Sequence, residues 1–379
     1  MALLIETSNA YGRGLLEGII RYARENHPWA FHVMEQGRAQ DPPAWLVDWD
    51  GDGIIARIET DRIARAVRRT KLPVVDLSAA RLVPALPWVE TDDVAIARLA
   101  FAHLHERGFK HFAYCGDARF NWSRWREDEF CRLVRAAGYE PRVYSPNGTR
   151  AGLAVEQRAL GEWLKQLPKP VGIMACYDIR GQQVLNGCRR AGLAVPDDVA
   201  VLGVDNDELL CELAAPPLSS VMPNTHRTGY EAARLLDRLM AGETVAPRAH
   251  LISPTGVAAR RSTDVLAIDD REIVRAVQFI REHACTGVNV GDVLAAAHLS
   301  RRVLEQRFRR LLGRTPHEEI LHVRLGRVRQ LLAETDLPLY LIAARTGFEH
   351  VEYLSVAFKR ELGLTPRQFR ERIRAGGEA

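Results

Sequence analysis

The segment 301–312 contains the residues whose types and spacing point most directly to chemistry. Its polar and basic residues fall on one side of a helix, and its apolar residues fall on the other. Guanidinium groups bind phosphates, and arginine or glutamine near a helix N-terminus can hydrogen-bond base edges in the major groove of DNA. A solvated basic helix in an ordinary bundle has the same pattern, so this alternative stays open. The DNA-binding candidates of this helix are Ser300, which is also placed to cap it, Arg301, Arg302, Glu305, Gln306 and Arg309.

A second helical pair, at 339–348 and 350–361, repeats this arrangement. Its first segment is apolar on one side and ends at a glycine, and its second presents polar residues outward. Two such pairs joined by a long helix can enter successive major-groove segments about one helical turn apart. Glu349 and Glu352 predict that the second pair contributes less electrostatic affinity than the first. Its DNA-binding candidates are His350, Tyr353, Lys359 and Arg360.

Residues 48–59 fit the pattern of a calcium-binding EF-hand loop. Acidic residues stand at loop positions one, three and five, a glycine stands at position six, and Glu59 stands at position twelve. Residues 53–56, however, form an apolar run typical of a buried strand, and the sequence has no second loop of this kind. We therefore predict no metal site in this segment.

Sequence motifs of enzymes are incomplete. Gly12, Gly14 and Gly18 resemble a dinucleotide-binding loop, but the third glycine comes one residue late and no acidic residue ends a second strand at the expected place. His317 and His322 are five residues apart and do not share the helix face that a zinc pair needs. There is no G-x-S-x-G elbow and no P-loop. We predict a protein that is not an enzyme, with no catalytic residues, metal or cofactor.

The first 260 residues alternate short apolar runs with amphipathic helical segments. The runs are too uniformly apolar for strands with one exposed face. This alternation predicts an α/β fold of parallel sheets covered by helices, and about nine candidate strands favour two lobes with a ligand crevice at the C-terminal strand ends. The clearest strands are predicted at 2–5, 53–56, 73–76, 111–115, 171–175 and 199–204, and the clearest helices at 14–24, 61–69, 94–106, 156–166, 180–190 and 229–240.

The pattern changes near residues 260–271, beyond which only helical periodicity continues. We expect two domains, 1–263 and 264–379, the second of them all-α with two helix-turn-helix motifs. Its helices are predicted at about 271–284, 290–297, 301–312, 316–333, 339–346 and 350–361.

Length, composition and charge agree with this organisation. The chain has 379 residues, of which 47% are hydrophobic and 26% charged, as in folded proteins of two or three domains. Residues 270–379 carry 19 Lys and Arg against 14 Asp and Glu, as expected for a module that binds a polyanion. The N-terminus lacks a basic region, no apolar stretch is long enough to span a bilayer, and the six cysteines are scattered. These features predict a cytoplasmic protein with reduced thiols and no membrane association.

A spaced set of residues runs through the second helical pair and its surroundings: Val328, Leu331, Leu332, Thr335, Pro338, Leu339, Ile342, Ala343, Gly347, Phe348, Leu354, Ser355, Phe358, Lys359, Arg360, Gly363, Thr365, Pro366, Phe369 and Arg370. The set resembles the signature of the DNA-binding domain of the arabinose-regulator (AraC) family and covers about 270–372. Family members commonly have Phe-Ser-Arg where this chain has Leu354-Ser355-Val356, so the usual arginine is absent. Arg301, Arg302 and Arg309 are therefore the principal DNA contacts that we expect.

The fold expected for residues 1–260 resembles the two-lobed, periplasmic-binding-protein-like sugar sensors of the lactose and galactose repressor (LacI/GalR) family, without their N-terminal DNA-binding headpiece. With the junction ARRSTD at 259–264 and the AraC-type domain, essentially the whole chain is similar to the family of bacterial xylose-operon activators. The resemblance implies a sugar in the crevice. Planar polar side chains would bind its vicinal hydroxyls, and an aromatic ring would cover its C–H face.

Polar and aromatic residues after the predicted strands match the cleft loops of these sensors. Each of them could instead form a surface ion pair or a helix cap, for which Asp178 and Asp205 are well suited, and the tryptophans could belong to the core. The sugar-binding candidates are Asn9, Tyr11, Arg13, Trp122, Trp125, Arg126, Asp178, Arg180, Asp205 and Asn206.

The resemblance implies a sugar-responsive transcriptional activator, in which sugar binding closes the lobes and favours one arrangement of the DNA-binding domains across a homodimer. The expected partners are D-xylose or a related pentose, double-stranded promoter DNA and RNA polymerase. One alternative is a regulator that responds to another pentose. A second is a sugar-binding protein or an enzyme whose helical C-terminus serves only assembly.

Overall fold

Twelve short strands form two six-stranded sheets in the computed structural model, which describes residues 1–35, 37–38, 40–144, 146, 153–264 and 270–375. The first sheet has the order β11-β5-β4-β3-β1-β2, and all its neighbouring strands are parallel. Its strands are β1 (Ala2–Leu4), β2 (His32–Val33), β3 (Ile54–Ala56), β4 (Val74–Asp76), β5 (Trp88–Thr91) and β11 (Ala249–Ile252).

The second sheet has the order β12-β10-β9-β8-β6-β7 and is parallel except for β12, which runs antiparallel to β10 at the edge. The predicted parallel sheets are thus confirmed, and each of the six strands named from the sequence lies within one residue of its predicted bounds. The strands of this sheet are β6 (His111–Cys115), β7 (Pro141–Tyr144), β8 (Val171–Ala175), β9 (Val199–Val204), β10 (Ser219–Met222) and β12 (Gly256–Ala258).

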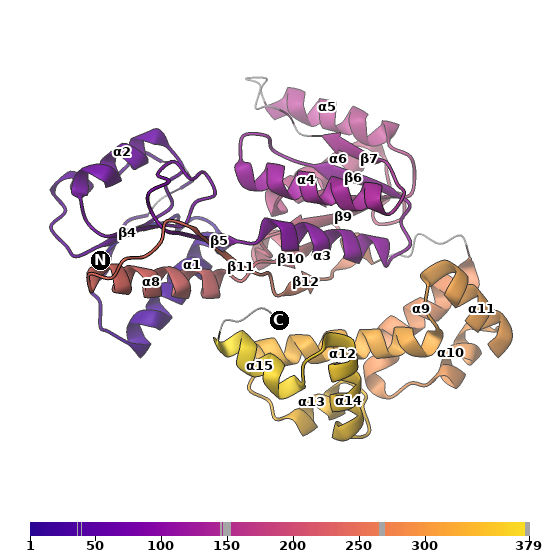
Figure 1. Cartoon of the computed structure of the whole chain (residues 1–379). Helices are drawn as coiled ribbons and strands as arrows, with labels where there is room; N and C mark the ends of the chain where they lie inside the picture. The colour runs from indigo at the N-terminus through magenta and orange to yellow at the C-terminus, as the bar shows by residue number, and fades with distance from the viewer. Residues whose placement is uncertain (36, 39, 145, 147–152, 265–269, 376–379) are drawn as a thin grey trace. The chain divides into compact units, whose positions relative to one another are not determined.

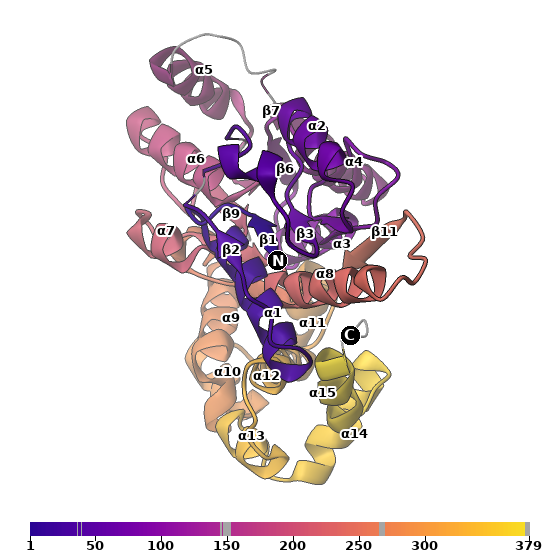
Figure 2. The ribbon, with the colours of Figure 1, turned by 90° about the vertical axis from the view of Figure 1, so that its left-hand side faces the viewer.

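Each sheet and the helices that cover it make one lobe of the N-terminal unit (Figure 1). The chain passes between the lobes after β5, after β10 and after β11. Helix α8 follows a strand of the second sheet, yet it packs beside α1 in the first-lobe core around Leu15, Ile19, Leu235 and Leu236 (Figure 2). The helices of this unit are α1 (Ala10–Glu25), α2 (Asp61–Thr70), α3 (Asp93–His105), α4 (Asn121–Ala136), α5 (Leu153–Gln166), α6 (Asp178–Ala191), α7 (Glu208–Leu213) and α8 (Thr225–Met240).

Glycines allow α1 and α8 to approach closely. A Cβ atom on Gly18 would lie 2.0 Å from the carbonyl oxygen of His226, and one on Gly229 would lie 1.9 Å from the carbonyl oxygen of Leu15. A Cβ atom on Gly14 would lie 2.1 Å from Thr225 Oγ1. The glycines that resemble a dinucleotide loop in the sequence therefore lie within a helix, where two of them serve helix packing.

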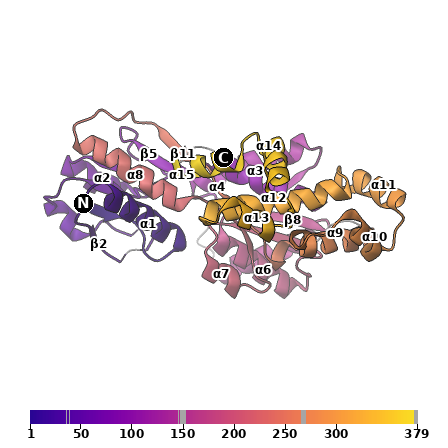
Figure 3. The ribbon, with the colours of Figure 1, turned by 90° about the horizontal axis from the view of Figure 1, so that it is seen from below.

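The C-terminal unit is all-α, as predicted. Helix α12 runs between two groups of helices (Figure 3). Helices α9 to α11 form one core with Ile280, Leu304 and Phe308, and α13 to α15 form another with Phe358 and Phe369. The helices are α9 (Arg271–His283), α10 (Val290–Ala297), α11 (Arg301–Leu312), α12 (Pro316–Glu334), α13 (Leu339–Arg345), α14 (Val351–Leu362) and α15 (Pro366–Ala375).

Helix α15 was not among the predicted helices, because its sequence is dominated by charged residues around Phe369. The predicted helices of this unit lie within two residues of their observed bounds, and the pairs α10–α11 and α13–α14 form the two helix-turn-helix motifs. In the part of the chain that the structure describes, no helix is both long and apolar enough to cross a membrane.

Candidate ligand cavity and nucleic-acid interface

A cavity lies between the two lobes of the N-terminal unit, where first-lobe strand ends meet α4 and the loop after β9. It contains about 430 Å³ of space free of protein atoms, part of it open to solvent. Because the lining comes from both lobes, a molecule bound here would contact both. The lining residues are Tyr11, Arg38, Arg57, Leu77, Ala79, Glu90, Thr91, Asp93, Trp122, Arg126 and Asp205.

Arg126 and Asp93 form a buried ion pair at one side of the cavity. Arg126 Nε donates to Asp93 Oδ1 at 2.6 Å, and Arg126 Nη1 donates to the carbonyl oxygen of Cys176 at 2.6 Å. Burial raises the pKa of Asp93 to about 6, and the attraction of Arg126 opposes this shift. The two bonds hold the guanidinium group in place as a fixed donor.

Arg57 provides a second fixed guanidinium group, directly after β3. Its Nη1 donates to Glu6 Oε2 at 2.9 Å and its Nη2 donates to Glu59 Oε1 at 2.5 Å. The guanidinium carbon lies 5.2 Å from the centre of the Tyr11 ring, and the Tyr11 hydroxyl lies 3.0 Å from Thr91 Oγ1. Burial raises the pKa of Tyr11, so its hydroxyl stays protonated and able to donate.

Asp205 follows β9 directly, and its backbone φ angle of 109° is positive, which residues with a side chain rarely adopt. Among the described residues, no donor lies within hydrogen-bond distance of its carboxylate. Burial raises the pKa of Asp205, while Arg126, Arg38 and Arg57 lower it. The carboxylate is therefore held among guanidinium groups with its acceptor positions unused.

Asp178 holds the loop that presents Asp205. Its Oδ1 accepts from Ser220 Oγ at 2.6 Å, and its Oδ2 accepts from the backbone N–H of Asp207 at 2.8 Å. Burial raises the pKa of Asp178 to about 8, and the nearby charge of Asp205 adds to the shift. The side chain of Asp178 thus acts on the loop and is not part of the cavity lining.

Trp122 forms the aromatic wall of the cavity. Its ring stacks on that of Phe120 with 5.0 Å between the ring centres, and it packs edge-on against the Tyr177 ring with 5.6 Å between the centres. The guanidinium carbon of Arg126 lies 5.0 Å from the Trp122 ring centre, and that of Arg38 lies 5.6 Å from it. These contacts fix the ring and give the cavity one apolar face beside its charged groups.

Of the ten sugar-binding candidates, Tyr11, Trp122, Arg126 and Asp205 line the cavity. The other six have different surroundings, several of which match the alternatives weighed from the sequence. Asn9 caps α1 by accepting a hydrogen bond from the backbone N–H of Gly12, and Arg13 donates to the carbonyl oxygen of Thr7. Trp125 lies under the guanidinium group of Arg81, and Asn206 accepts a hydrogen bond from Arg260. Asp178 holds the loop after β9, and Arg180 belongs to a separate network.

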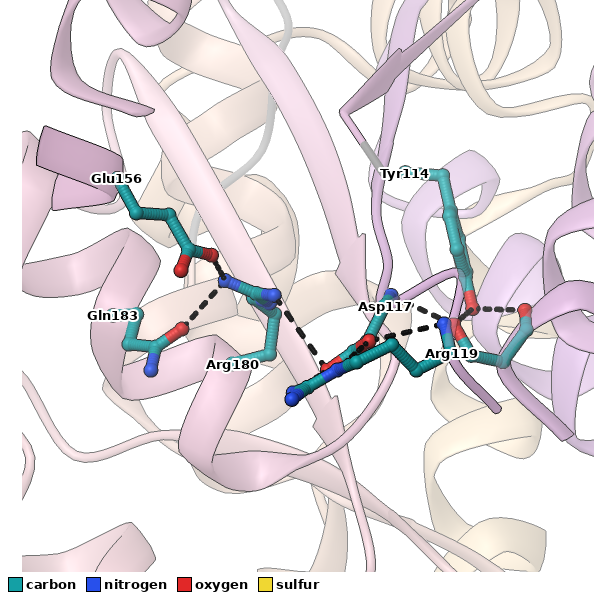
Figure 4. Close-up of polar contacts among 7 residues, drawn as sticks. Tyr114, Asp117, Arg119, Glu156, Arg180 and Gln183 are labelled. Carbon is teal, nitrogen blue, oxygen red and sulfur yellow. Dashed lines mark hydrogen bonds and ion pairs between the residues drawn. The ribbon is translucent and has the colours of Figure 1, made fainter. Parts of the chain in front are cut away.

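Arg180 is buried in a polar network of the second lobe (Figure 4). Its Nη1 donates to Glu156 Oε1 at 2.6 Å and to Gln183 Oε1 at 2.7 Å, and its Nη2 lies 3.9 Å from Asp117 Oδ2. Asp117 also accepts two bonds from the side chain of Arg119. The network ties α5 and α6 to the loop after β6, so Arg180 stabilises the second lobe.

The other polar residues of the cavity are not among the candidates from the sequence: Arg38, Arg57, Glu90, Thr91 and Asp93. Arg57 comes directly after the predicted strand at 53–56, and this position at a strand end is a sequence signal for it. Glu90, Thr91 and Asp93 end β5 or follow it, and that strand was not among those named from the sequence. Arg38 belongs to an irregular segment and carries no sequence signal of this kind.

Helix α11 presents the predicted basic face. Leu304 and Phe308 are fully buried, Arg301, Arg302, Gln306 and Arg309 are exposed, and Glu305 is half-exposed. Ser300 occupies the N-cap position, but its side chain makes no capping hydrogen bond. The five polar side chains from Arg301 to Arg309 surround a shallow, open depression on the helix surface.

Helix α14 and its N-cap residue expose all four DNA-binding candidates of the second pair: His350, Tyr353, Lys359 and Arg360. Tyr353 is 45% exposed and Val356 is 66% exposed. The outer face of α14 is thus less basic in its first two turns than that of α11, as predicted from Glu349 and Glu352.

Three sequence families match consecutive parts of the chain. Residues 1–94 match the XylR N-terminal domain, residues 101–263 match the periplasmic binding protein-like domain, and residues 293–372 match a helix-turn-helix domain.

Similar proteins extend over the whole chain. The xylose operon regulatory protein of Escherichia coli strain K12 is 33% identical over 98% of this chain and 96% of its own length. The protein of the same name from Haemophilus influenzae is 32% identical over 98% of this chain and 97% of its own length. A solved structure of the xylose-binding transcription activator XylR aligns with a TM-score of 0.63 and 32% identity, covering 100% of this chain and 98% of that one.

Proposed function

Because the chain belongs to the family of xylose operon regulatory proteins, we propose that it binds D-xylose in the cavity between its lobes and activates genes of xylose use. The chain is a sugar-responsive, DNA-binding transcriptional regulator and not an enzyme. One observation supports the cavity as the sugar site above the others. The partly buried carboxylate of Asp205 has no protein donor among the described residues, and it lines the same cavity as Arg57 and Arg126.

The lining fits the chemistry of a pentose. A carboxylate can accept from two vicinal hydroxyls, and fixed guanidinium groups can donate to the oxygens of the same or neighbouring hydroxyls. The Trp122 ring offers an apolar surface to the C–H face of the sugar. Asp205, Arg57 and Trp122 would therefore pair the polar groups of a buried sugar and cover its apolar groups.

Sugar binding between the lobes supplies the regulatory step. Tyr11 and Arg57 belong to the first lobe, and Trp122 and Asp205 belong to the second. A sugar that contacts both walls binds the closed arrangement of the lobes more tightly than the open one, and only such a difference in affinity shifts their populations.

The remaining partners follow from regulation of a promoter. The double-stranded promoter DNA would be held by α11 and α14, and activation would require contact with RNA polymerase. We propose a homodimer, because two copies double the number of helix-turn-helix motifs that bind one DNA site. Once one copy is bound, the effective concentration of the other at the DNA is high, so the dimer binds the site more tightly than one copy does. A cytoplasmic location follows from promoter DNA as the partner.

Calorimetric titration with D-xylose, D-ribose, L-arabinose and D-glucose tests the sugar site. We expect selective binding of D-xylose by the wild-type protein. Asp205→Ala should weaken this binding about 100-fold or more, since it removes two charge-assisted hydrogen bonds. Arg13→Ala is the matched control, because Arg13 is exposed and does not line the cavity, and its affinity should stay within about two-fold of wild type.

The possible contrary results are distinct. Preference for another of these pentoses would replace D-xylose by that sugar and leave the cavity in place. If no sugar binds, or if Arg13→Ala loses as much affinity as Asp205→Ala, the cavity is not the sugar site.

A further inference from the structure

The two recognition helices have the same architecture, fifty residues apart in the sequence. Helices α11 and α14 both contain 12 residues, and each ends at a glycine with left-handed backbone, Gly313 with φ 71 and Gly363 with φ 73. Each is followed by a Thr-Pro pair before the next helix. The buried residues of α11 also recur in α14 at the same spacing: Leu304 corresponds to Leu354 and Phe308 to Phe358.

The outward residues of the first two turns do not recur. In α11 they include the hydrogen-bonding side chains of Arg302 and Gln306, and the equivalent residues of α14 are Glu352 and Val356. Val356 is 66% exposed, so it contributes little to the core of the motif. The difference between Arg302 and Gln306 on α11 and their equivalents on α14 therefore lies on the surface that would meet base edges, because the N-terminal part of a recognition helix faces the bases.

The last turn keeps its charge. Arg309 and Arg310 of α11 correspond to Lys359 and Arg360 of α14, and all four are exposed. Both helices can therefore bind phosphates at this end. Since the scaffold and the basic residues of the last turn are alike, the two helices can lie in the groove in the same way and read different groups there.

We propose that α14 recognises the 5-methyl groups of thymines through Val356 and Tyr353, whereas α11 recognises the hydrogen-bond acceptors of purines. The proposal rests on DNA binding by this domain and adds the class of base that each helix reads. Valine has no hydrogen-bonding group, and the thymine methyl is the apolar group that base pairs present in the major groove. Tyr353, 45% exposed on the preceding turn of the same face, extends the apolar surface.

The side chain of Glu352 also favours thymine and cytosine over guanine under α14. A carboxylate on the reading surface repels phosphates and the acceptor-rich edge of guanine, and it can accept a hydrogen bond from the amino group of cytosine. The part of the binding site under α14 should therefore be defined by thymines and cytosines. The part under α11 should be defined by guanines and adenines, which arginine and glutamine bind with two hydrogen bonds.

Replacement of thymine by deoxyuridine tests the proposal without changing the protein. The full-length protein, with D-xylose present, first selects a site from a pool of random double-stranded DNA. Each thymine of that site is then replaced singly by deoxyuridine, which lacks the methyl group, and the Kd is measured by fluorescence anisotropy. We expect some replacements to weaken wild-type binding about four-fold each, as the loss of one buried methyl group predicts.

The variant Val356→Ala identifies the contact. At the thymines that Val356 touches, this variant should bind the thymine and deoxyuridine sites equally well. Gln306→Ala, the equivalent change on α11, is the matched control and should keep the full sensitivity to these methyl groups while losing affinity for the site as a whole.

Two results would overturn the proposal. One is wild-type binding that no deoxyuridine replacement weakens, and the other is a Val356→Ala variant that remains as sensitive to every replacement as wild type. If the wild-type protein selects no site from the pool, DNA binding itself is contradicted and the proposal falls with it.

Discussion

At the scale of single residues, the surroundings of three buried aspartates in the N-terminal unit determine both their pKa values and their structural roles. Burial raises the pKa of Asp93 to about 6 and raises the pKa of Asp76 and of Asp178 to about 8. Asp93 lines the cavity in an ion pair with Arg126, Asp178 holds the loop after β9, and Asp76 supports the first lobe. The same residue type thus lines the cavity, supports a loop beside it and stabilises the first lobe.

The Asp76 carboxyl group makes stability depend on pH in a predictable direction. Its pKa in the folded protein, about 8, lies above the ordinary value of 3.8, so the folded state keeps a proton that the unfolded state releases. The stability from this group is complete below pH 3.8 and is lost as the pH rises to about 8. We expect the free energy of unfolding to fall by up to about 1.4 kcal/mol per pH unit in this window from Asp76 alone.

The variant Asp76→Asn isolates this effect. Oδ1 of Asp76 accepts from the backbone N–H groups of both Ile58 and Ser78, and an asparagine oxygen can accept the same two bonds. Chemical denaturation across the window should therefore show a shallower decline for the variant, although Asp178 still titrates in the second lobe. A variant profile parallel to that of wild type would show that Asp76 does not carry this dependence.

At the scale of elements, the contact between α1 and α8 depends on the absence of side chains. A Cβ atom on Gly18 would meet backbone atoms of α8, which cannot move aside as a side chain can. Gly18→Ala should destabilise the N-terminal unit by about 1–3 kcal/mol, the usual cost of overpacking.

The control for Gly18→Ala is Gly161→Ala in α5, where an added Cβ atom would have no neighbour within 4 Å among the described residues. This variant should be neutral or more stable by up to about 1 kcal/mol, because alanine favours the helix. Thermal unfolding of the two variants provides the comparison. Equal midpoints would contradict the role of Gly18 in helix packing.

The elements differ in how well the sequence predicts them. Strands such as β8 and β9 are buried along their whole length, so an unbroken apolar run marks them. Strands β2 and β11 are exposed or half-exposed and short, and their residues depend on pairing with neighbours far along the chain. The helices of the C-terminal unit follow from periodicity and caps, except α15, whose sequence is mostly polar and charged around Phe369.

The residues of the cavity also differ in how well the sequence predicts them. Tyr11 and Asp205 were predicted because they follow strands with clear sequence signals. Asp93 follows β5, a strand that contains Glu90 and Thr91 and gives no such signal. The position of Arg38 near the rings of Phe120 and Trp122 brings together residues more than eighty positions apart, and no local pattern predicts this contact.

At the scale of the whole molecule, the chain joins a ligand-binding unit to a DNA-binding unit. The relatives are single regulators that span both parts, and the cavity lies between the two lobes of the first unit. We therefore expect that a sugar bound there changes the affinity for DNA. Such coupling between two sites typically amounts to about 5–150-fold in affinity.

The most direct measurement is the Kd for a selected DNA site, with and without saturating D-xylose, for wild type and for Asp205→Ala at one fixed salt concentration. We predict that D-xylose changes the wild-type Kd about five-fold or more and leaves that of Asp205→Ala unchanged. An unchanged wild-type Kd, or an equal change in the variant, would show that sugar binding in this cavity does not control the affinity for DNA.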